Sequence, residues 1–245
     1  GAFRAERFRR RPLRRCEVWG QVEGGFPRGW LIQVSFLAPL TGSLARVLPI
    51  GLAAVIGAEV LKAYNSINPL YGAARADFFR YLIIYKEGGV YLDVKSTATK
   101  PLTPTIDPEA AFVISQWPNK VGQLYVGYGL HPELADVPGG EFQQWNVMAE
   151  PRHPFLKAVI ARVLNNIRTY TPSQFGTDAY GVLRVSGPIA FTQAIYPLLD
   201  HYPHKVIDVE SWGIVYSIYD AGGVDTIDVS AHTRGSIIDL TPGAY

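Results

Sequence analysis

The hydrophobic residues between positions 72 and 87 recur with the period of an α-helix. They stand at positions i, i+3, i+4 and i+7 of this segment: Phe78, Tyr81, Leu82 and Tyr85. This spacing places side chains on one helical face. Because glycine readily adopts positive φ, Gly88 and Gly89 allow the chain to turn back after the helix. Residues 90–94 are rich in β-forming side chains, so we expect a buried helix that leads into a buried strand.

The same kind of pattern predicts further elements along the chain. Residues 153–168 carry an apolar stripe with Pro154 in the first turn, and residues 187–199 begin with Pro188 in a first-turn position. Strands are expected at residues 111–115, 206–209, 214–218 and 226–229. Because helices and strands are interspersed, the fold class is expected to be α/β.

The chain divides into two parts by composition. Residues 58–245 contain no internal repeat, low-complexity tract or Ser/Gly linker, so we expect them to form one domain. Residues 1–57 are atypical, because seven arginines stand among the first 15 residues and two uncharged runs of 17 and 12 residues follow. Such a segment is typical of a membrane anchor, but a membrane span needs about 20 mostly apolar residues. A folded strand-and-helix region and a disordered lead are the alternatives.

Composition and charge then narrow the class of protein. With 48% hydrophobic and 18% charged residues, the chain can bury a core, which excludes wholesale disorder. The net charge is +2 and the strongest positive charge is confined to the first 15 residues, so nucleic-acid binding is not expected. Cys16 is the single cysteine, which excludes an internal disulfide and a cysteine-built zinc site. Phosphate-loop, serine-hydrolase and zincin motifs are absent from the sequence.

Candidate chemistry stands at the end of the strand expected at residues 90–94. Side chains alternate along a strand, so Tyr91, Asp93 and Lys95 share one face. A carboxylate at the end of an apolar strand, where a loop opens, is well placed to meet a ligand. A solvated ion pair between Asp93 and Lys95 explains the same spacing, so spacing alone leaves both interpretations open.

Residues 74–93 carry a more specific signal over twenty consecutive positions. They resemble the signature of the DXD-containing glycosyltransferases of family 32, in which an (A/S)-x-x-x-D-x-x-R-Y helix leads into G-G-x-Y-x-D-x-D. Weaker matches follow in the expected order at residues 100–102, 146–154 and 186–188, so the resemblance covers about residues 60–195. Residues 1–57 do not show the opening strand that is usual in this family.

The resemblance implies a fold, an activity and partners. The fold would be GT-A-like, a Rossmann-type α/β sandwich that binds a nucleotide sugar, usually with Mn²⁺ or Mg²⁺. The activity would be transfer of a hexose to a glycan, lipid or protein acceptor, with retention at the anomeric carbon. A cation held by carboxylates neutralises the charge that develops on a departing diphosphate. The expected location is the Golgi or another endomembrane in a eukaryote, and the cytoplasm or the inner membrane in a bacterium, with membrane association through residues 1–57.

The resemblance also implies roles for individual residues. Asp93 matches the first aspartate of the motif and is expected to act in catalysis and metal binding. The residues expected to bind the donor are Asp77, Arg80, Gly88, Gly89, Tyr91, Asn146 and Gly187. Two of these assignments have simpler explanations. Arg80 stands three residues after Asp77 and can pair with it across one helical turn, and a helix stop explains at least one of the paired glycines.

Lys95 departs from the family pattern, which has a second carboxylate at this position. An ammonium group cannot coordinate a cation, so three outcomes stay open. Ser96 or Thr97 supplies other oxygens to the metal, Lys95 itself acts in catalysis by neutralising the diphosphate, or catalysis is lost. The last outcome would leave a non-catalytic homologue that binds a nucleotide sugar or a glycan.

His232 is the remaining candidate metal ligand. Residues 232–236 weakly resemble a C-terminal element of the family in which a histidine or a nearby polar group closes the donor site. An ordinary loop histidine is the alternative.

Overall fold

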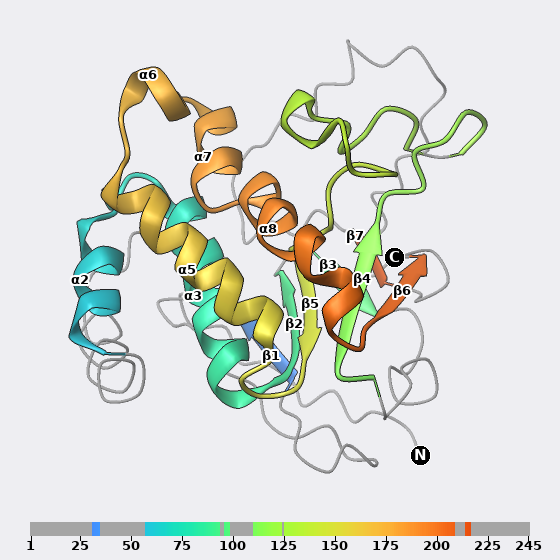
Figure 1. The fold of residues 1–245 in the computed structure, drawn as a ribbon, viewed down its shortest axis with the longest axis horizontal. Helices are drawn as coiled ribbons and strands as arrows, with labels where there is room; N and C mark the ends of the chain where they lie inside the picture. The colour runs from blue at the N-terminus through green and yellow to red at the C-terminus, as the bar shows by residue number, and fades with distance from the viewer. Residues whose placement is uncertain are drawn as a thin grey trace, which may run out of the picture.

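The computed structural model describes residues 57–93, 110–123 and 125–208, together with three short strands. A five-stranded sheet forms its centre (Figure 1). Its strands, in spatial order, are β1 (Leu31–Val34), β2 (Gly89–Asp93), β5 (Asn146–Ala149), β4 (Phe112–Gln116) and β6 (Lys205–Asp208). Two further strands, β3 (Ser96–Ala98) and β7 (Ile214–Tyr216), pair with each other in antiparallel orientation.

The strand directions define the two edges of this sheet. β1 runs parallel to β2 and β6 runs parallel to β4, whereas β5 lies antiparallel between β2 and β4. The four strands other than β5 therefore share one direction, and their carboxyl ends meet at one edge. We call this the carboxyl edge and the opposite one the amino edge. Ligands of open α/β sheets bind outside the carboxyl ends of the strands.

Helices cover one face of the sheet. The α-helices are α2 (Ala58–Ser66), α3 (Gly72–Glu87), α5 (Pro154–Arg168), α6 (Pro172–Phe175), α7 (Ala179–Val185) and α8 (Pro188–Ile195). Two 3₁₀-helices, η1 (Pro132–Leu134) and η2 (Tyr196–His201), complete the described part of the chain. Figure 1 shows α3, α5 and α8 as neighbouring helices on one side of the strands.

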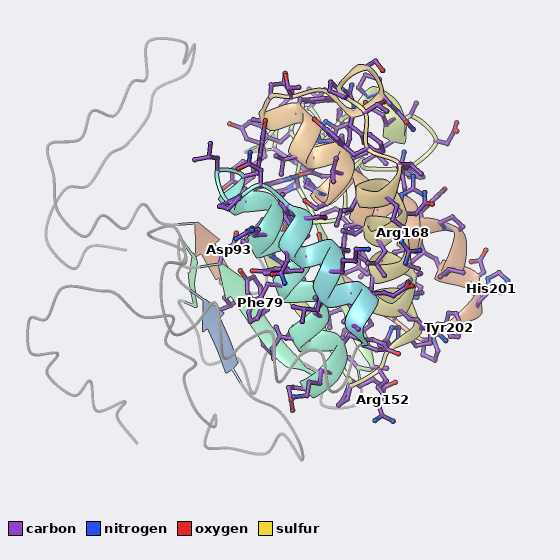
Figure 2. The ribbon with its side chains drawn as sticks, turned by 90° about the vertical axis from the view of Figure 1, so that its left-hand side faces the viewer. Phe79, Asp93, Arg152, Arg168, His201 and Tyr202 are labelled. Atoms are coloured by element: carbon purple, nitrogen blue, oxygen red, sulfur yellow. The ribbon has the colours of Figure 1, made fainter. Side chains whose placement is uncertain are left out.

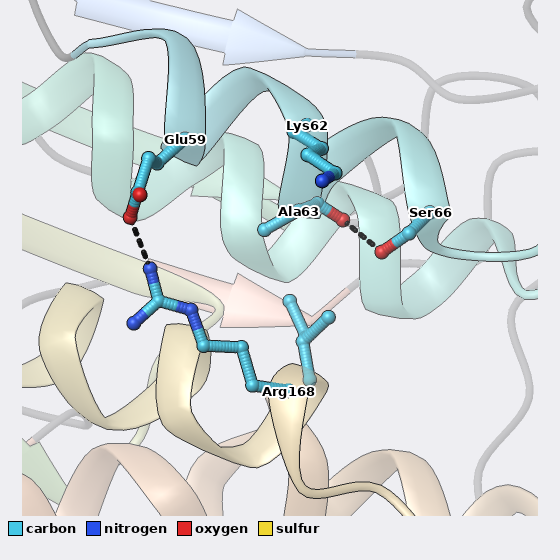
Figure 3. A pocket seen from close by; sticks show the side chains of 6 residues that line it. Glu59, Lys62, Ala63, Ser66 and Arg168 are labelled. Atoms are coloured by element: carbon cyan, nitrogen blue, oxygen red, sulfur yellow. Dashed lines mark hydrogen bonds and ion pairs between the residues drawn. The ribbon is translucent and has the colours of Figure 1, made fainter.

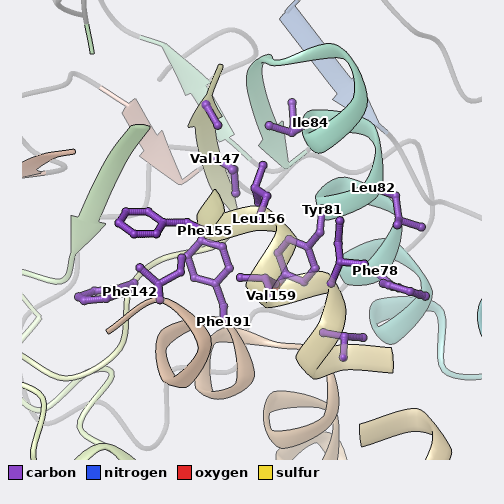
Figure 4. Close-up of a cluster of buried hydrophobic side chains, with 14 of the residues drawn as sticks. Phe78, Tyr81, Leu82, Ile84, Phe142, Val147, Phe155, Leu156, Val159 and Phe191 are labelled. Carbon is purple, nitrogen blue, oxygen red and sulfur yellow. The ribbon is translucent and has the colours of Figure 1, made fainter. Parts of the chain in front are cut away.

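The main hydrophobic core lies between these helices and the sheet (Figure 4). Tyr81 of α3 stacks on Phe191 of α8 with ring centroids 5.5 Å apart. The sheet contributes alternate residues to this core, whereas Val90 and Leu92 belong to a smaller cluster on the other face. The alternation predicted for β2 is therefore confirmed, because Tyr91 faces the helices.

The sequence patterns located most of these elements. The helix predicted at residues 72–87 is α3 with the same bounds, and the helix predicted at 153–168 is α5, which begins one residue later. The helix predicted at 187–199 ends as α8 at Ile195 and continues as the 3₁₀-helix η2. The strand predicted at 226–229 lies outside the described residues.

The N-terminal part holds one correction. β1 pairs in parallel with β2, with Leu31 opposite Val90, so an opening strand joins the sheet although the sequence pattern did not show one. Most of residues 1–57 lie outside the described part, and the membrane-anchor interpretation stays a prediction. None of the described helices has both the length and the apolar character needed to cross a membrane.

Candidate active site

A charged cluster joins α3 to the carboxyl end of β2. Asp93 is the last residue of β2, and its Oδ1 lies 3.0 Å from Nη2 of Arg80. The same nitrogen lies 3.2 Å from Oδ1 of Asp77, one helical turn earlier. One guanidinium group therefore holds two carboxylates. The local pairing of Arg80 with Asp77 is confirmed, and Asp93, labelled beside α3 in Figure 2, is a further partner.

Gln144 completes the cluster from the loop before β5. Its side-chain oxygen and its backbone carbonyl both accept hydrogen bonds from Nη1 of Arg80. Its amide nitrogen donates to Oδ1 of Asp77 at 2.9 Å. Ser186 donates to the other carboxylate oxygen of Asp77 at 3.0 Å. Sequence reasoning assigned no role to Gln144 or Ser186, although Gln144 lies beside, and Ser186 within, a segment that resembles the family.

Two tyrosines support the cluster from within the core. The Tyr91 hydroxyl donates to Oδ1 of Asp93 at 2.7 Å, and its ring centroid lies 4.8 Å from the Arg80 guanidinium carbon. The Tyr81 hydroxyl donates to the backbone carbonyl of Ser186 at 2.8 Å. The expected donor-binding residues Asp77, Arg80 and Tyr91 are therefore brought together with Asp93.

The charged side chains of this cluster differ in how far they are exposed to solvent. Asp77 and Arg80 are each only 4% exposed, whereas the Asp93 side chain is 26% exposed. Burial raises the pKa of Asp77, although Arg80, Gln144 and Ser186 oppose this shift. Burial alone would lower the pKa of Arg80, but its electrostatic interactions with Tyr91, Asp93 and Asp77 raise it above its ordinary value. Arg80 is therefore permanently charged, and Asp93 is the carboxylate that a ligand can reach.

Asn146 belongs to a neighbouring buried polar group at the same edge. Ser115 donates to the side-chain oxygens of Gln143 and Asn146 at 3.0 and 2.8 Å, and Asn146 donates to Gln143 at 3.2 Å. In the sheet Asn146 pairs with Leu92, the residue before Asp93. The structure thus places Asn146 next to the charged cluster, with its side chain 4% exposed and hydrogen-bonded to protein.

The three glycines expected at the donor site have other structural explanations. Gly88 and Gly89 have φ of 68° and 98° and lie at the amino end of β2, across the sheet from Asp93. A Cβ atom on Gly88 would lie 2.5 Å from Cδ of Pro151. Gly187 precedes α8, and a Cβ atom there would lie 2.8 Å from the Leu183 Cα. Turn geometry and close packing explain these residues, and their contact with a donor stays a prediction.

The expected metal ligands are only partly described. Lys95 and His232 lie outside the described residues, and Asp93 Oδ1 already contacts Arg80 and Tyr91. Within the described part of the chain, no group of three or more His, Cys, Asp or Glu side chains could hold a metal ion. These residues therefore supply one candidate carboxylate rather than a complete ligand set for Mn²⁺ or Mg²⁺.

Two cavities lie apart from this cluster. One, of about 370 Å³, is lined by α2 and the end of α5, where Glu59 and Arg168 form an exposed ion pair at 2.5 Å (Figure 3). The other, of about 490 Å³, includes Tyr71, Tyr170 and Asp178 in its lining. Neither of these two is lined by any residue predicted from the sequence to bind the donor or a metal.

Comparison with known proteins agrees with the position of the charged cluster. Residues 53–113 match the family model described as the glycosyltransferase sugar-binding region containing a DXD motif. Over these residues the chain is similar to the sugar-binding region of this glycosyltransferase family. The match includes Asp77, Arg80 and Asp93, so the charged cluster lies within the segment that defines the family.

The similar proteins include two fungal enzymes named initiation-specific alpha-1,6-mannosyltransferase. The Candida albicans enzyme is 29% identical over 154 residues, which cover 58% of this chain and 39% of the relative. The Schizosaccharomyces pombe enzyme is 25% identical over 167 residues, which cover 66% and 40%. The chain thus spans about two fifths of the length of these relatives. A solved structure titled PaToxG Glycosyltransferase is 19% identical and covers 58% of this chain and 42% of its own, with a TM-score of 0.37.

Proposed function

We propose that the carboxyl edge of the sheet binds a nucleotide sugar and that the chain transfers its hexose to an acceptor. One observation carries this proposal. A partly exposed carboxylate, Asp93, ends β2 at the edge where ligands of α/β sheets bind, and the buried Arg80 holds it in place. The match to the glycosyltransferase family model and the names of the fungal relatives support the same reaction class.

The described residues suit the binding of a sugar. A carboxylate accepts hydrogen bonds from two neighbouring hydroxyl groups, and the ion pair with Arg80 holds the Asp93 carboxylate in place for this task. Asp77 is buried and its oxygens accept from Arg80, Gln144 and Ser186, so we assign it a positioning role. This arrangement fixes the Asp93 carboxylate before the donor arrives, which lowers the cost of ordering the site.

In the proposed reaction the bond from the anomeric carbon to the diphosphate oxygen breaks and a bond to the acceptor oxygen forms. The acceptor hydroxyl loses its proton to the departing diphosphate, and configuration at the anomeric carbon is retained. A GT-A-like arrangement of the sheet is part of this proposal. Its support is the set of parallel strands whose carboxyl ends meet at one edge, with helices packed on one face.

A second candidate function follows from the sequence itself. Because Lys95 replaces the second carboxylate of the family pattern, the chain would bind a nucleotide sugar or a glycan without transferring the sugar. A requirement for Mn²⁺ or Mg²⁺ belongs to the first candidate, with Asp93 as the described residue that would contribute to the ligand set.

A donor screen separates the two candidates. Nucleotide sugars are incubated with the wild-type chain and with Asp93→Asn, with and without Mn²⁺, and release of the nucleotide is measured. We expect the wild type to consume one donor. Asp93→Asn should consume it at less than about a hundredth of the wild-type rate, because the side chain that contacts the sugar has lost its charge. Binding without consumption in wild type would select the non-catalytic candidate, and equal turnover by a folded Asp93→Asn would remove Asp93 from the mechanism.

A further inference from the structure

Three aromatic side chains form a cluster directly after β4, and we call Trp117, Tyr125 and Tyr128 the aromatic platform. The Trp117 ring centroid lies 4.9 Å from that of Tyr125 and 5.6 Å from that of Tyr128, and the two tyrosine rings lie 5.5 Å apart. Tyr128 is 53% exposed. These rings therefore contact one another, and the Tyr128 ring presents aromatic surface to solvent.

Hydrogen bonds hold the backbone under the platform. The buried Asn119 side chain donates to the carbonyls of Tyr128 and Gly139 at 2.7 and 2.9 Å. The backbone amide of Tyr125 donates to the carbonyl of Pro118 at 3.1 Å. The Trp117 indole N–H donates to Oε1 of Glu141 at 2.6 Å. These hydrogen bonds hold the loop that carries the rings, so a ligand would meet the rings in a fixed arrangement.

The platform adjoins the charged cluster described above. Trp117 follows Gln116, the residue that ends β4 at the carboxyl edge. The Trp117 ring centroid lies 6.3 Å from that of Trp145, and the Trp145 carbonyl accepts the backbone N–H of Asp93 at 2.8 Å. One residue, Trp145, therefore connects the platform to the end of β2.

We propose that the aromatic platform binds a terminal pyranose of a glycan acceptor. This inference rests on the proposed function, since a transferase places its acceptor next to the donor sugar, and the platform adjoins Asp93. A pyranose has an apolar C–H face that stacks on an aromatic ring and hydroxyl groups that remain hydrated or bind polar neighbours. The exposed ring of Tyr128, packed against Trp117, offers such an aromatic face at the surface.

A glycan suits this surface better than a membrane does. The loop that carries the platform has exposed apolar side chains, Val121 and Leu130, which would also suit lipid. However, residues 117–130 contain a single base, Lys120, whereas attraction to anionic headgroups requires a cluster of bases. Membrane binding is therefore kept as an outcome of the test.

The direct test is to titrate the protein with trisaccharides built of mannose, glucose or galactose and to measure their binding by saturation-transfer NMR. Tyr128→Ala removes a ring that is mostly outside the core, Tyr128→Phe keeps it, and Tyr202→Ala removes a 38% exposed tyrosine near the amino edge. We expect one trisaccharide to bind the wild type, Tyr128→Phe and Tyr202→Ala alike, and to bind Tyr128→Ala about tenfold more weakly. No binding of any trisaccharide to the wild type, or unchanged binding to Tyr128→Ala, would overturn the inference.

Two further measurements separate this inference from its alternatives. Release of nucleotide with water as acceptor needs no glycan, so Tyr128→Ala should hydrolyse the donor like wild type while its KM for the trisaccharide rises. A wild type that fails to consume any donor would remove the proposed transferase activity, and the titration would still decide whether the platform binds a glycan. Sedimentation with vesicles of phosphatidylcholine and phosphatidylserine that is lost in Tyr128→Ala, without any trisaccharide effect, would replace the glycan with a membrane surface.

Discussion

The two edges of the sheet bury polar groups in opposite ways. At the carboxyl edge, Arg80 and Asp77 are buried as charges and reach the surface through Asp93. At the amino edge, His153 is 1% exposed, and burial lowers its pKa to about 4, so it is neutral at pH 7. Its ring packs 4.8 Å from the rings of both Phe112 and Phe155.

Of the two edges, the carboxyl edge is therefore the one that buries charged side chains. Replacing a buried ion cluster by apolar residues is often neutral or stabilising, so a buried cluster by itself is weak evidence for a stabilising role. The amino edge shows that this sheet can close an end with aromatic packing and a neutral imidazole. The presence of Arg80, Asp77 and Asp93 at the carboxyl edge therefore supports the proposed donor site more than a purely structural role.

The largest effect on stability is expected at Arg80. Arg80→Met removes the cation while Asp77 stays buried, so the free energy of unfolding should fall by about 3–5 kcal/mol. Urea unfolding followed by circular dichroism measures this change. Because the variant also lacks the guanidinium group that holds Asp93, donor binding should be lost even where the protein remains folded.

A second substitution sharpens this expectation. In Arg80→Met/Asp77→Asn the buried carboxylate is replaced by a neutral amide of similar shape, so much of the lost stability should return while donor binding stays absent. A double variant no more stable than Arg80→Met would show that the lost packing of the arginine side chain, rather than the unpaired charge, causes the effect.

The amino edge should be sensitive to pH through His153. Its pKa of about 4 in the folded chain lies below the ordinary value near 6.5 for an unfolded chain, so the unfolded state binds more protons between these values. Stability should therefore fall as pH drops from about 6.5 to 4, by about 2–3 kcal/mol from this group. His153→Asn keeps a side chain that can cap α5 but cannot titrate there, and the difference between the two urea curves across pH isolates the contribution. Parallel curves for both proteins would mean that His153 protonates without a penalty.

A smaller effect is expected at Gly88, also on the amino edge. Its φ of 68° is strained for alanine, and a Cβ atom would meet Pro151, so Gly88→Ala should cost about 2 kcal/mol of unfolding free energy. Pro151→Ala in the same chain should return the part due to the contact. Donor turnover per folded molecule should not change if packing alone explains Gly88, and a loss of turnover at full folding would support its predicted contact with the donor.

The sequence predicted the parts of the site that depend on local periodicity. The helical spacing located α3, and the alternation in β2 placed Tyr91 and Asp93 on one face, as the hydrogen bond between them shows. Gln144 was not predicted, because its position depends on β5 lying between β2 and β4, an order that the chain does not follow. The pair of glutamines just before the strand at residues 146–149 is the signal that could have drawn attention to it.

β1 was missed for a similar reason. Its four residues carry no strong pattern, and their partner strand begins more than fifty residues later. Long-range pairing of this kind is decided by the completed sheet, in which β1 pairs along the side of β2 that β5 leaves unpaired. Short segments give little local evidence of such pairing.

The smallest effect on stability, and the sharpest contrast between stability and function, is expected at Asp93. Asp93→Asn leaves Arg80 paired with Asp77, and the amide oxygen can still accept from the Tyr91 hydroxyl. Because the side chain is also partly exposed, the free energy of unfolding should change by less than about 1 kcal/mol. Calorimetric titration with the donor found by the screen should nevertheless show binding weakened by at least about tenfold, since an amide cannot replace a carboxylate that accepts two hydroxyl hydrogen bonds. A large loss of stability with unchanged donor affinity would reverse the comparison, because the carboxyl edge would then be held for folding and the ligand would have to bind elsewhere.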